Sequence, residues 1–392
     1  MKGVHRPGTA SGSAGRTGVV NRLPGGALDG DVGRVPRADD QSWSEAMILK
    51  KEGTRSSTRS RLRAGLLCAG AALALFAADA SACVPTKLPM GVKGPGLCYG
   101  AETWPEPTLG GRTLEQQFDF YRTPSTTPTP LIVWAHPNGM SKALPQDSPM
   151  YQALVVPALR AGFSFASIEF RHPVANDALP NSDADPGVPH YDLAYALQFI
   201  RANADALNID KRNVFFVGQS RGSLAVWTAL QDDMRDPDSP NPVARQSTRV
   251  NAVYAVNAQT TYSGADFANR FLIPADRAKF TAAFNQQHPK HEQFGSAIGS
   301  VNAGVKADPP VRLIYDSPEV GRLLSLEEMS KRDPIHYPDF GPALCRAYAL
   351  AFGSSAYCTY DADTRYEGDP IAAYAGYVDF FKRYIRPGTR SP

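Results

Sequence analysis

One short segment combines a candidate nucleophile with the small residues that such a group needs around it. Gly218, Ser220 and Gly222 form a G-x-S-x-G motif between the apolar run 214–217 and an Ala- and Leu-rich run. A serine in a sharp strand-to-helix turn exposes its hydroxyl, and the flanking glycines let strand and helix approach closely. Such a serine attacks acyl carbon atoms, and the backbone N–H of Arg221 is a candidate donor for the resulting oxyanion.

A second motif follows an earlier apolar run and is the candidate for the other half of an oxyanion site. Residues 134–139 read Trp-Ala-His-Pro-Asn-Gly. Pro137 has no N–H, so the second donor must come from a residue after it. We interpret His136 as part of this loop rather than as a catalytic acid or base. The candidate donors are Asn138, Gly139 and Met140.

The base and the acid of a catalytic triad have candidates in the last third of the chain. His336 is the only histidine after the carboxylates that follow the strand-like run 311–315, which makes it a candidate base; the family resemblance described below, with its order of serine, acid and histidine, implies that role. Asp316 or Glu319 could orient its ring, and we slightly favour Asp316 because it lies nearer the strand end. The rival acids are Asp361 and Asp363.

The other histidines have weaker patterns. His172 and His190 flank predicted elements and could line a cleft, but loop packing or capping is the favoured interpretation. His288 and His291 have ligand-like spacing in a polar segment, and because no third ligand is in view we predict a solvated surface there. The proposed chemistry requires no cofactor and no metal.

Strand-like and helix-like segments alternate along the chain, which predicts an α/β fold with a mostly parallel sheet covered by helices. A polar loop is expected at 232–248, and helical stretches without a clear strand at 258–308 predict an insertion or lid. The predicted strands are 118–122, 131–134, 163–170, 214–217, 250–256, 311–315 and 356–360. The predicted helices are 150–161, 192–203, 221–230, 342–352 and 371–385.

The order of these motifs resembles the α/β-hydrolase superfamily, and within it the esterase and lipase group, over most of residues 83–392. The resemblance implies an α/β-hydrolase fold and a carboxylesterase that forms an acyl-enzyme, acting on a small-molecule or polymer ester such as a decorated plant polysaccharide or a polyester. Two departures stand out: residues 136–139 read His-Pro-Asn-Gly where an H-G-G-type turn is usual, and no histidine follows the last predicted strand.

Two alternatives share the same fold. A peptidase of the prolyl-oligopeptidase kind would carry the same serine turn and would cleave amides. An exported binding protein that has lost catalysis would retain the turn without a working base. The distance between Ser220 and His336 in the folded chain discriminates between an active and an inactive site.

The N-terminal 82 residues differ in composition from the rest of the 392-residue chain. Residues 1–46 are polar and without periodicity, which indicates disorder or a mis-assigned start. Residues 47–82 combine a basic stretch, an apolar run too short to span a membrane and an Ala-Ser-Ala end, which predicts a signal peptide and a secreted or periplasmic protein. Cleavage after Ala82 would make Cys83 the first residue, so a lipoprotein anchor there is a second, less favoured interpretation.

The charge content argues against a nucleic acid partner, and the cysteine content indicates disulfides. Downstream of residue 82 there are 29 basic and 31 acidic residues, so we expect no concentrated basic field and no nucleic acid partner. Removal of Cys68 with the signal peptide leaves four cysteines, an even number that favours disulfides in an exported protein. The pairings we favour, which spacing alone does not prove, are Cys83–Cys98 and Cys345–Cys358.

Overall fold

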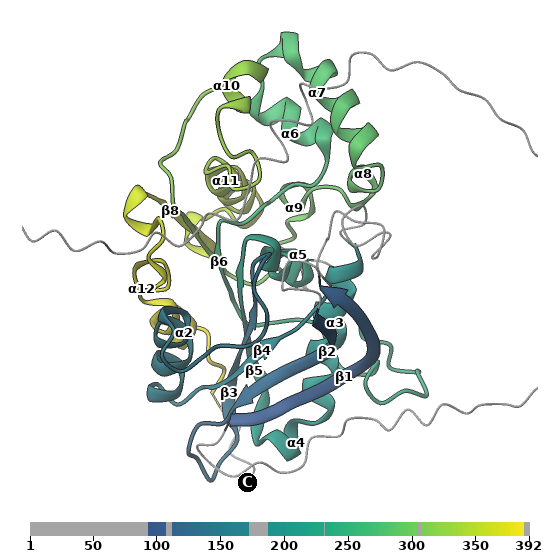
Figure 1. Ribbon diagram of the computed structural model, residues 1–392, viewed down its shortest axis with the longest axis vertical. Coiled ribbons are helices and arrows are strands. Elements are labelled where there is room, and N and C mark those ends of the chain that lie inside the picture. The colour runs from purple at the N-terminus through teal and green to yellow at the C-terminus, as the bar shows by residue number, and fades with distance from the viewer. Residues whose placement is uncertain (1–92, 107–111, 172–186, 231, 305–306, 388–392) are drawn as a thin grey trace, which may run out of the picture. The chain divides into compact units, whose positions relative to one another are not determined.

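The central element is one eight-stranded sheet with the strand order β1-β2-β4-β3-β5-β6-β7-β8 (Figure 1). The computed structural model describes residues 93–106, 112–171, 187–230, 232–304 and 307–387. The pairs β1–β2 and β2–β4 are antiparallel, and all the pairs from β4 to β8 are parallel. The strands are β1 (Lys93–Glu106), β2 (Arg112–Tyr121), β3 (Thr129–Ala135), β4 (Ser164–Ile168), β5 (Ile209–Gln219), β6 (Val253–Val256), β7 (Val311–Tyr315) and β8 (Cys358–Ala362).

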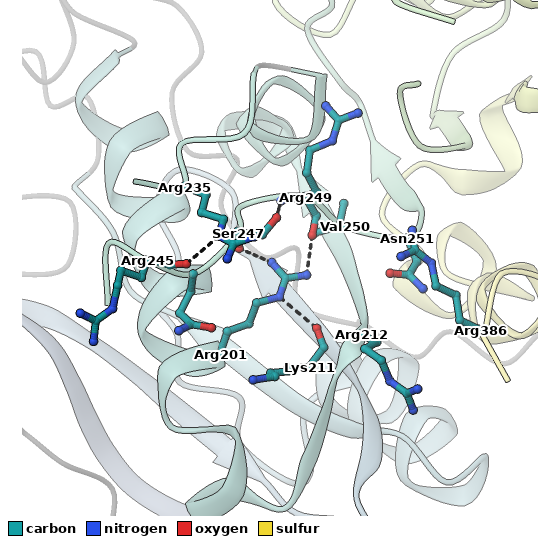
Figure 2. A pocket seen from close by; sticks show the side chains of 11 residues that line it. Arg201, Lys211, Arg212, Arg235, Arg245, Ser247, Arg249, Val250, Asn251 and Arg386 are labelled. Atoms are coloured by element: carbon teal, nitrogen blue, oxygen red, sulfur yellow. Dashed lines mark hydrogen bonds between the residues drawn. The ribbon is translucent and has the colours of Figure 1, made fainter. Parts of the chain in front are cut away.

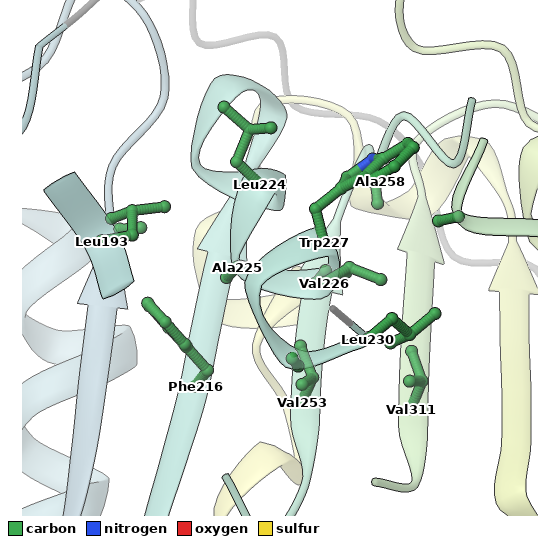
Figure 3. Packing of buried hydrophobic residues seen from close by; sticks show 14 of the residues in the cluster. Leu193, Phe216, Leu224, Ala225, Val226, Trp227, Leu230, Val253, Ala258 and Val311 are labelled. Carbon is green, nitrogen blue, oxygen red and sulfur yellow. The ribbon is translucent and has the colours of Figure 1, made fainter. Parts of the chain in front are cut away.

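Both faces of the sheet are buried, which explains why the central strands read as continuous apolar runs rather than as alternating ones. Successive residues of β5 show this, because Phe216 belongs to one buried cluster and Phe215 to the other. The first face is covered by α3 (Gly187–Ala202) and α5 (Leu224–Leu230), and the second by α2 (Pro149–Arg160) and α13 (Tyr377–Lys382). Figure 3 shows α5 lying against the inner strands.

The observed elements match most of the predicted ones, and the fold is that of an α/β hydrolase. The predicted closing helix 371–385 is wrong as one element, because it is divided into α12 (Pro370–Ala373) and α13. Gly376 separates the two with a φ of 76°, a left-handed conformation that an α-helix does not contain. The Pro/Gly-rich start forms β1, which the sequence did not indicate.

The predicted insertion at 258–308 consists of helices that pack against the chain between β7 and α11 (Phe340–Phe352). Phe267 and Phe271 contact Tyr337 and Phe340 at ring-centroid distances of 5.1–6.3 Å. Figure 1 shows α6, α7 and α10 grouped together beyond one end of the sheet. That residues 258–308 act as a lid stays a prediction. The helices of residues 258–308 are α6 (Gly264–Phe271), α7 (Pro274–Gln287), α8 (His291–Phe294) and α9 (Ala297–Ser300), whereas α10 (Leu326–Ser330) follows β7.

Several predictions fall outside the described residues: the disorder of 1–46, the signal peptide 47–82, the anchor at Cys83 and the position of His172. The Cys83–Cys98 pair is likewise outside, since Cys83 and the side chain of Cys98 are not described. The Cys345–Cys358 pairing is confirmed, and it links α11 to β8. None of the helices in the described ranges has the length and apolar character that crossing a membrane requires.

Candidate active site

Ser220 stands at the turn between β5 and the helical segment that follows it. Its φ is 50°, in the left-handed region that a residue with a side chain seldom occupies, and β5 ends at the preceding residue. The short 3-10 turn Ser220–Ser223 leads directly into α5. This strained turn places the serine at the carboxyl end of the parallel strands, where such sheets carry their sites.

The two glycines of the motif are required by close backbone contacts. A Cβ on Gly218 would lie 2.1 Å from the carbonyl oxygen of Gly222, and a Cβ on Gly222 would lie 2.0 Å from that of Ala135. The second contact joins the serine turn to the end of β3. The sequence-based interpretation that these glycines leave room for strand and helix is confirmed.

His336 lies beside Ser220. Its Nε2 atom is 2.7 Å from Ser220 Oγ, although 116 residues separate the two in sequence. The histidine is in the segment between α10 and α11, after β7 rather than after β8. The expected proximity of His336 to Ser220 is therefore present, on a different connection from the one that the superfamily resemblance implies.

The carboxylate that orients His336 is Asp333, which the sequence analysis did not select. Asp333 Oδ2 accepts a hydrogen bond from His336 Nδ1 at 2.7 Å, so that Nε2 keeps its lone pair for the serine O–H. Asp333 Oδ1 also accepts from the N–H groups of Ile335 at 2.9 Å and His336 at 3.3 Å. The Asp333 carboxylate thus stabilises the turn and also orients the imidazole ring of His336.

The pKa of Asp333 reflects its contact with His336. Burial by itself raises the pKa of Asp333, but the hydrogen bond and charge of His336, with the two backbone N–H groups, outweigh it and leave the pKa lowered. The carboxylate therefore stays ionised at neutral pH. An ionised Asp333 in this position can stabilise a positively charged His336 ring, as a catalytic base requires.

The choice of Asp316 or Glu319 as the orienting acid is wrong, because the carboxylate that accepts from His336 Nδ1 is that of Asp333. The Asp316 carboxylate accepts from the Asn257 side chain at 2.7 Å, and its N–H donates to the same amide at 3.1 Å. Glu319 is exposed and acts on Tyr360, whose pKa is raised first by burial and then by this carboxylate. Both acids follow β7, but their partners hold them in other directions.

The two rival acids also have other partners. Asp361 accepts from Tyr366 at 2.5 Å and pairs with Arg365, and Asp363 caps the turn that begins after β8 by accepting from the Arg365 N–H at 2.8 Å. A local signal pointed to Asp333 instead. An aspartate two or three residues before a position commonly accepts from that N–H in an Asx turn, and Asp333 stands three before His336.

The turn after β3 presents donors of which two are engaged. The N–H of Gly139, whose φ is 77°, donates to Asn138 Oδ1 at 3.1 Å, and that of Met140 donates to the Pro137 carbonyl at 3.3 Å. Among the described residues, none accepts from the N–H of Asn138. Of the predicted donors, Asn138 is therefore the one whose N–H this turn does not use itself.

His136 is buried beneath this turn and positions it. Its Nε2 lies 2.9 Å from Glu169 Oε1, and the other carboxylate oxygen accepts from the Lys142 N–H at 3.1 Å. The imidazole also packs against Phe170 at 4.9 Å between ring centroids. His136 and Glu169 thus tie both ends of the turn 136–142 to the end of β4. The expectation that His136 belongs to the loop agrees with these contacts.

The remaining described histidines lie inside the protein. His190 lies within α3 rather than in a loop before it, its ring packs on Phe294 of α8, and burial lowers its pKa to about 4. The predicted solvated surface at His288 and His291 is wrong, because both are 5% exposed. Their rings stack at 4.6 Å, and Phe284 covers them both, an arrangement that a local reading of a polar segment does not reveal. No group of three metal-ligating side chains occurs among the described residues.

Comparison with known proteins gives one family match. The family model described as BD-FAE matches residues 118–317, about half of the chain. The matched region contains the serine turn and the turn after β3, and it ends before Asp333 and His336. No curated protein matches the chain in sequence.

Several solved structures are similar. A truncated carbohydrate esterase from gut microbiota is 17% identical with a TM-score of 0.48, over 75% of this chain and 96% of that one. An acetyl ester-xyloside bifunctional hydrolase from Caldicellulosiruptor lactoaceticus is 17% identical with a TM-score of 0.46, over 76% and 94%. Esterase 2 of Thermogutta terrifontis with bound butyrate is 13% identical with a TM-score of 0.46, over 75% and 96%.

Proposed function

Because this chain belongs to the BD-FAE family and has the fold of an α/β hydrolase, we propose that it is a serine carboxylesterase with the triad Ser220, His336 and Asp333. The observation that carries the proposal is the continuous line of contacts from Ser220 Oγ to His336 Nε2 and from His336 Nδ1 to Asp333, each 2.7 Å long. Nucleophile, base and orienting acid are within hydrogen-bond reach, as acyl transfer requires.

The reaction has two stages, acylation and deacylation of Ser220, and each stage includes two proton transfers through His336. His336 Nε2 accepts the Ser220 proton while Oγ forms a bond to the ester carbonyl carbon. The tetrahedral intermediate collapses when the carbon–alkoxide bond breaks, and the imidazolium gives its proton to the departing alcohol. Water then loses a proton to His336, attacks the acyl-enzyme and releases the acid as the Ser220 hydroxyl re-forms.

The negative charge of each tetrahedral intermediate requires donors on the side away from His336. Arg221 follows the nucleophile at the start of the helical segment, where backbone N–H groups and the helix dipole favour an anion. Asn138 contributes the second backbone N–H from the turn after β3. Gly222 packs on Ala135, so the two donor segments are held against each other.

The decisive experiment is labelling with a fluorophosphonate probe, which reacts with activated serines. We expect the wild type to carry the adduct on Ser220, located by peptide mass, and we expect Ser220→Ala and His336→Ala to lose it. Asp316→Asn is the matched control and should label like the wild type. A folded wild type that does not label would instead favour the non-catalytic binding protein.

A substrate panel addresses the bond that is cleaved. We expect hydrolysis of p-nitrophenyl acetate and of acetylated polysaccharide, because the site holds the groups for acyl transfer from an ester, and a polyester film tests the polymer alternative. Matched anilides should react far more slowly. Anilide cleavage without ester cleavage would replace the esterase proposal with the peptidase one.

We also propose that the protein is exported and secreted or periplasmic. The support is the signal-like pattern of residues 47–82 and the Cys345–Cys358 disulfide, a bond that persists in oxidising compartments. N-terminal sequencing of the exported protein should begin at Cys83. A lipid-modified Cys83 would support the anchored form, and an uncleaved cytosolic product would contradict export.

A further inference from the structure

A cavity of about 490 Å³ lies at the end of the sheet opposite to Ser220, where β5 begins and the chain approaches β6 (Figure 2). Its lining holds seven cationic side chains and, among the described residues, no carboxylate. They come from segments far apart in sequence. Around Arg201 they are Lys211, Arg212, Arg235, Arg245, Arg249 and Arg386.

Arg201 fixes the wall of this cavity. It is 7% exposed, and its guanidinium donates to the carbonyl oxygens of Lys211, Ser247 and Arg249, as Figure 2 shows. It thereby joins the start of β5 to the strand approaching β6. Burial lowers the pKa of Arg201 to about 10, Asp233 opposes this and Arg386 adds to it, so the group remains charged at neutral pH.

The cationic charge of the cavity is only partly balanced. Arg212 pairs with Asp210 at 2.8 Å, and Arg249 with Asp308 at 3.7 Å. For Lys211, Arg235, Arg245 and Arg386 the described part of the chain provides no carboxylate in ion-pair contact. Like charges gathered in one concave site repel each other and destabilise the folded state, so an anion that enters the site relieves a cost already present.

We propose that this cavity binds a small, multiply charged anion with at least two carboxylate, sulfate or phosphate groups. Guanidinium groups suit such oxyanions because their N–H groups donate in pairs. The volume lies in the range of small-molecule pockets, and cations on several sides of the cavity favour more than one anionic group. The site is independent of the proposed hydrolase activity, since it lies at the opposite end of the strands from Ser220.

Calorimetric titration of the full chain tests the proposal with two probes. Trigalacturonate carries three sugar carboxylates, and tripolyphosphate represents free phosphate anions. We expect at least one of them to bind with a dissociation constant of about 1 mM or tighter, and to bind more weakly as salt screens the charges.

The variant Arg245→Gln/Arg386→Gln removes two cations from the lining and keeps the backbone contacts of both residues. We expect it to weaken binding by about tenfold or more, because hydrogen bonds to charged groups are lost. The control Arg160→Gln/Arg383→Gln removes two exposed cations outside this cavity and should bind like the wild type. Ester hydrolysis should be unchanged in both variants.

The titrations with the two probes have the following possible outcomes. Binding of trigalacturonate that is lost in the cavity variant assigns an acidic sugar to the site, and the same result with tripolyphosphate alone assigns a phosphate compound. Both support the proposal. Absence of binding by either probe, or equal weakening in the control variant, overturns it while leaving the esterase proposal untouched.

Discussion

The acid and base of this site come from one short stretch of chain, Asp333 to His336. Because Asp333 accepts from the Ile335 and His336 N–H groups as well as from the ring, the turn and the imidazole share a single anchor. An orienting acid three residues from its histidine makes the base independent of the strand β8. This explains how the fold places a histidine and a carboxylate in line with Ser220 although no histidine follows its last strand.

The Asp333→Asn variant tests this arrangement. We expect kcat for p-nitrophenyl acetate to fall by about 10²–10⁴-fold, because an amide at this position no longer holds the tautomer with a free Nε2 lone pair and no longer stabilises the imidazolium. KM should change little. Asp316→Asn and Glu319→Gln are the matched controls and should stay within about threefold of the wild type, since the carboxylate that accepts from His336 Nδ1 is that of Asp333. An equal loss of kcat in Asp316→Asn would indicate that Asp316, the acid after β7, orients the histidine instead.

At the scale of elements, the serine turn and the turn after β3 form one unit through Gly222. Its substitution by Ala would place a Cβ 2.0 Å from the Ala135 carbonyl, which is backbone and has no rotamer to change. We expect Gly222→Ala to lower the free energy of unfolding by about 3 kcal/mol or more and to abolish labelling of Ser220. Gly299→Ala in α9, with no atom within 4 Å of its added Cβ, is the control. Denaturant unfolding that gives equal stabilities for both variants would refute the steric argument.

The His136–Glu169 pair holds the turn after β3, which carries the proposed oxyanion donor, so we expect its loss to lower kcat. In Glu169→Ala, both carboxylate oxygens are removed, so the contact with His136 Nε2 and the hydrogen bond from the Lys142 N–H are both lost. We expect kcat to fall by about tenfold with KM within about twofold, because the donor of Asn138 matters most to the transition state. Steady-state kinetics on p-nitrophenyl acetate measure both constants. A rise in KM at constant kcat would show that the pair shapes substrate binding instead.

The elements that position the site were largely predictable from the sequence, and the reason is local. The run before Ser220, the glycines and the alternation of strand-like and helix-like segments are properties of neighbouring residues. The acid was less predictable, because Asp316, Glu319 and Asp333 all stand before His336 and the Asx-turn spacing of Asp333 is the single local sign in its favour. The Asn257 amide that holds the Asp316 carboxylate comes from another strand connection, so no local pattern excludes Asp316.

At the scale of the whole molecule, the net charge of the sequence was a poor guide to the local charge, because folding brings residues of one sign together. The 29 basic and 31 acidic residues after residue 82 sum to near neutrality, and we therefore expected no concentrated basic field. The folded chain nevertheless gathers seven cations around one cavity. The burial of His288 and His291 also depends on the fold, because the aromatic side chains that contact them come from α7 and from the segment between β6 and α6.

Asp308, which faces Arg249 near this cavity, links global stability to pH. Burial raises its pKa from 3.8 to about 6, although the Asn302 N–H and Arg249 act in the opposite direction. The unfolded chain therefore releases this proton at lower pH than the folded one. As pH rises from 4 through 6, ionisation favours the unfolded state, so the contribution of Asp308 to stability falls and its full cost is present above pH 6.

The Asp308→Asn variant should remove that cost, because the Asn oxygen still accepts from the Asn302 N–H, a 2.7 Å bond in the wild type. We expect the variant to be more stable than the wild type at about pH 8 by on the order of 1 kcal/mol, after allowance for solvent screening, and to match it at about pH 4. Urea unfolding at both pH values measures the difference. Asp379→Asn, an exposed change in α13, is the control and should show no pH-dependent gain. A gain that is the same at both pH values would mean that Asp308 does not titrate with the raised pKa, and the stability change would then have a steric or hydrogen-bonding cause.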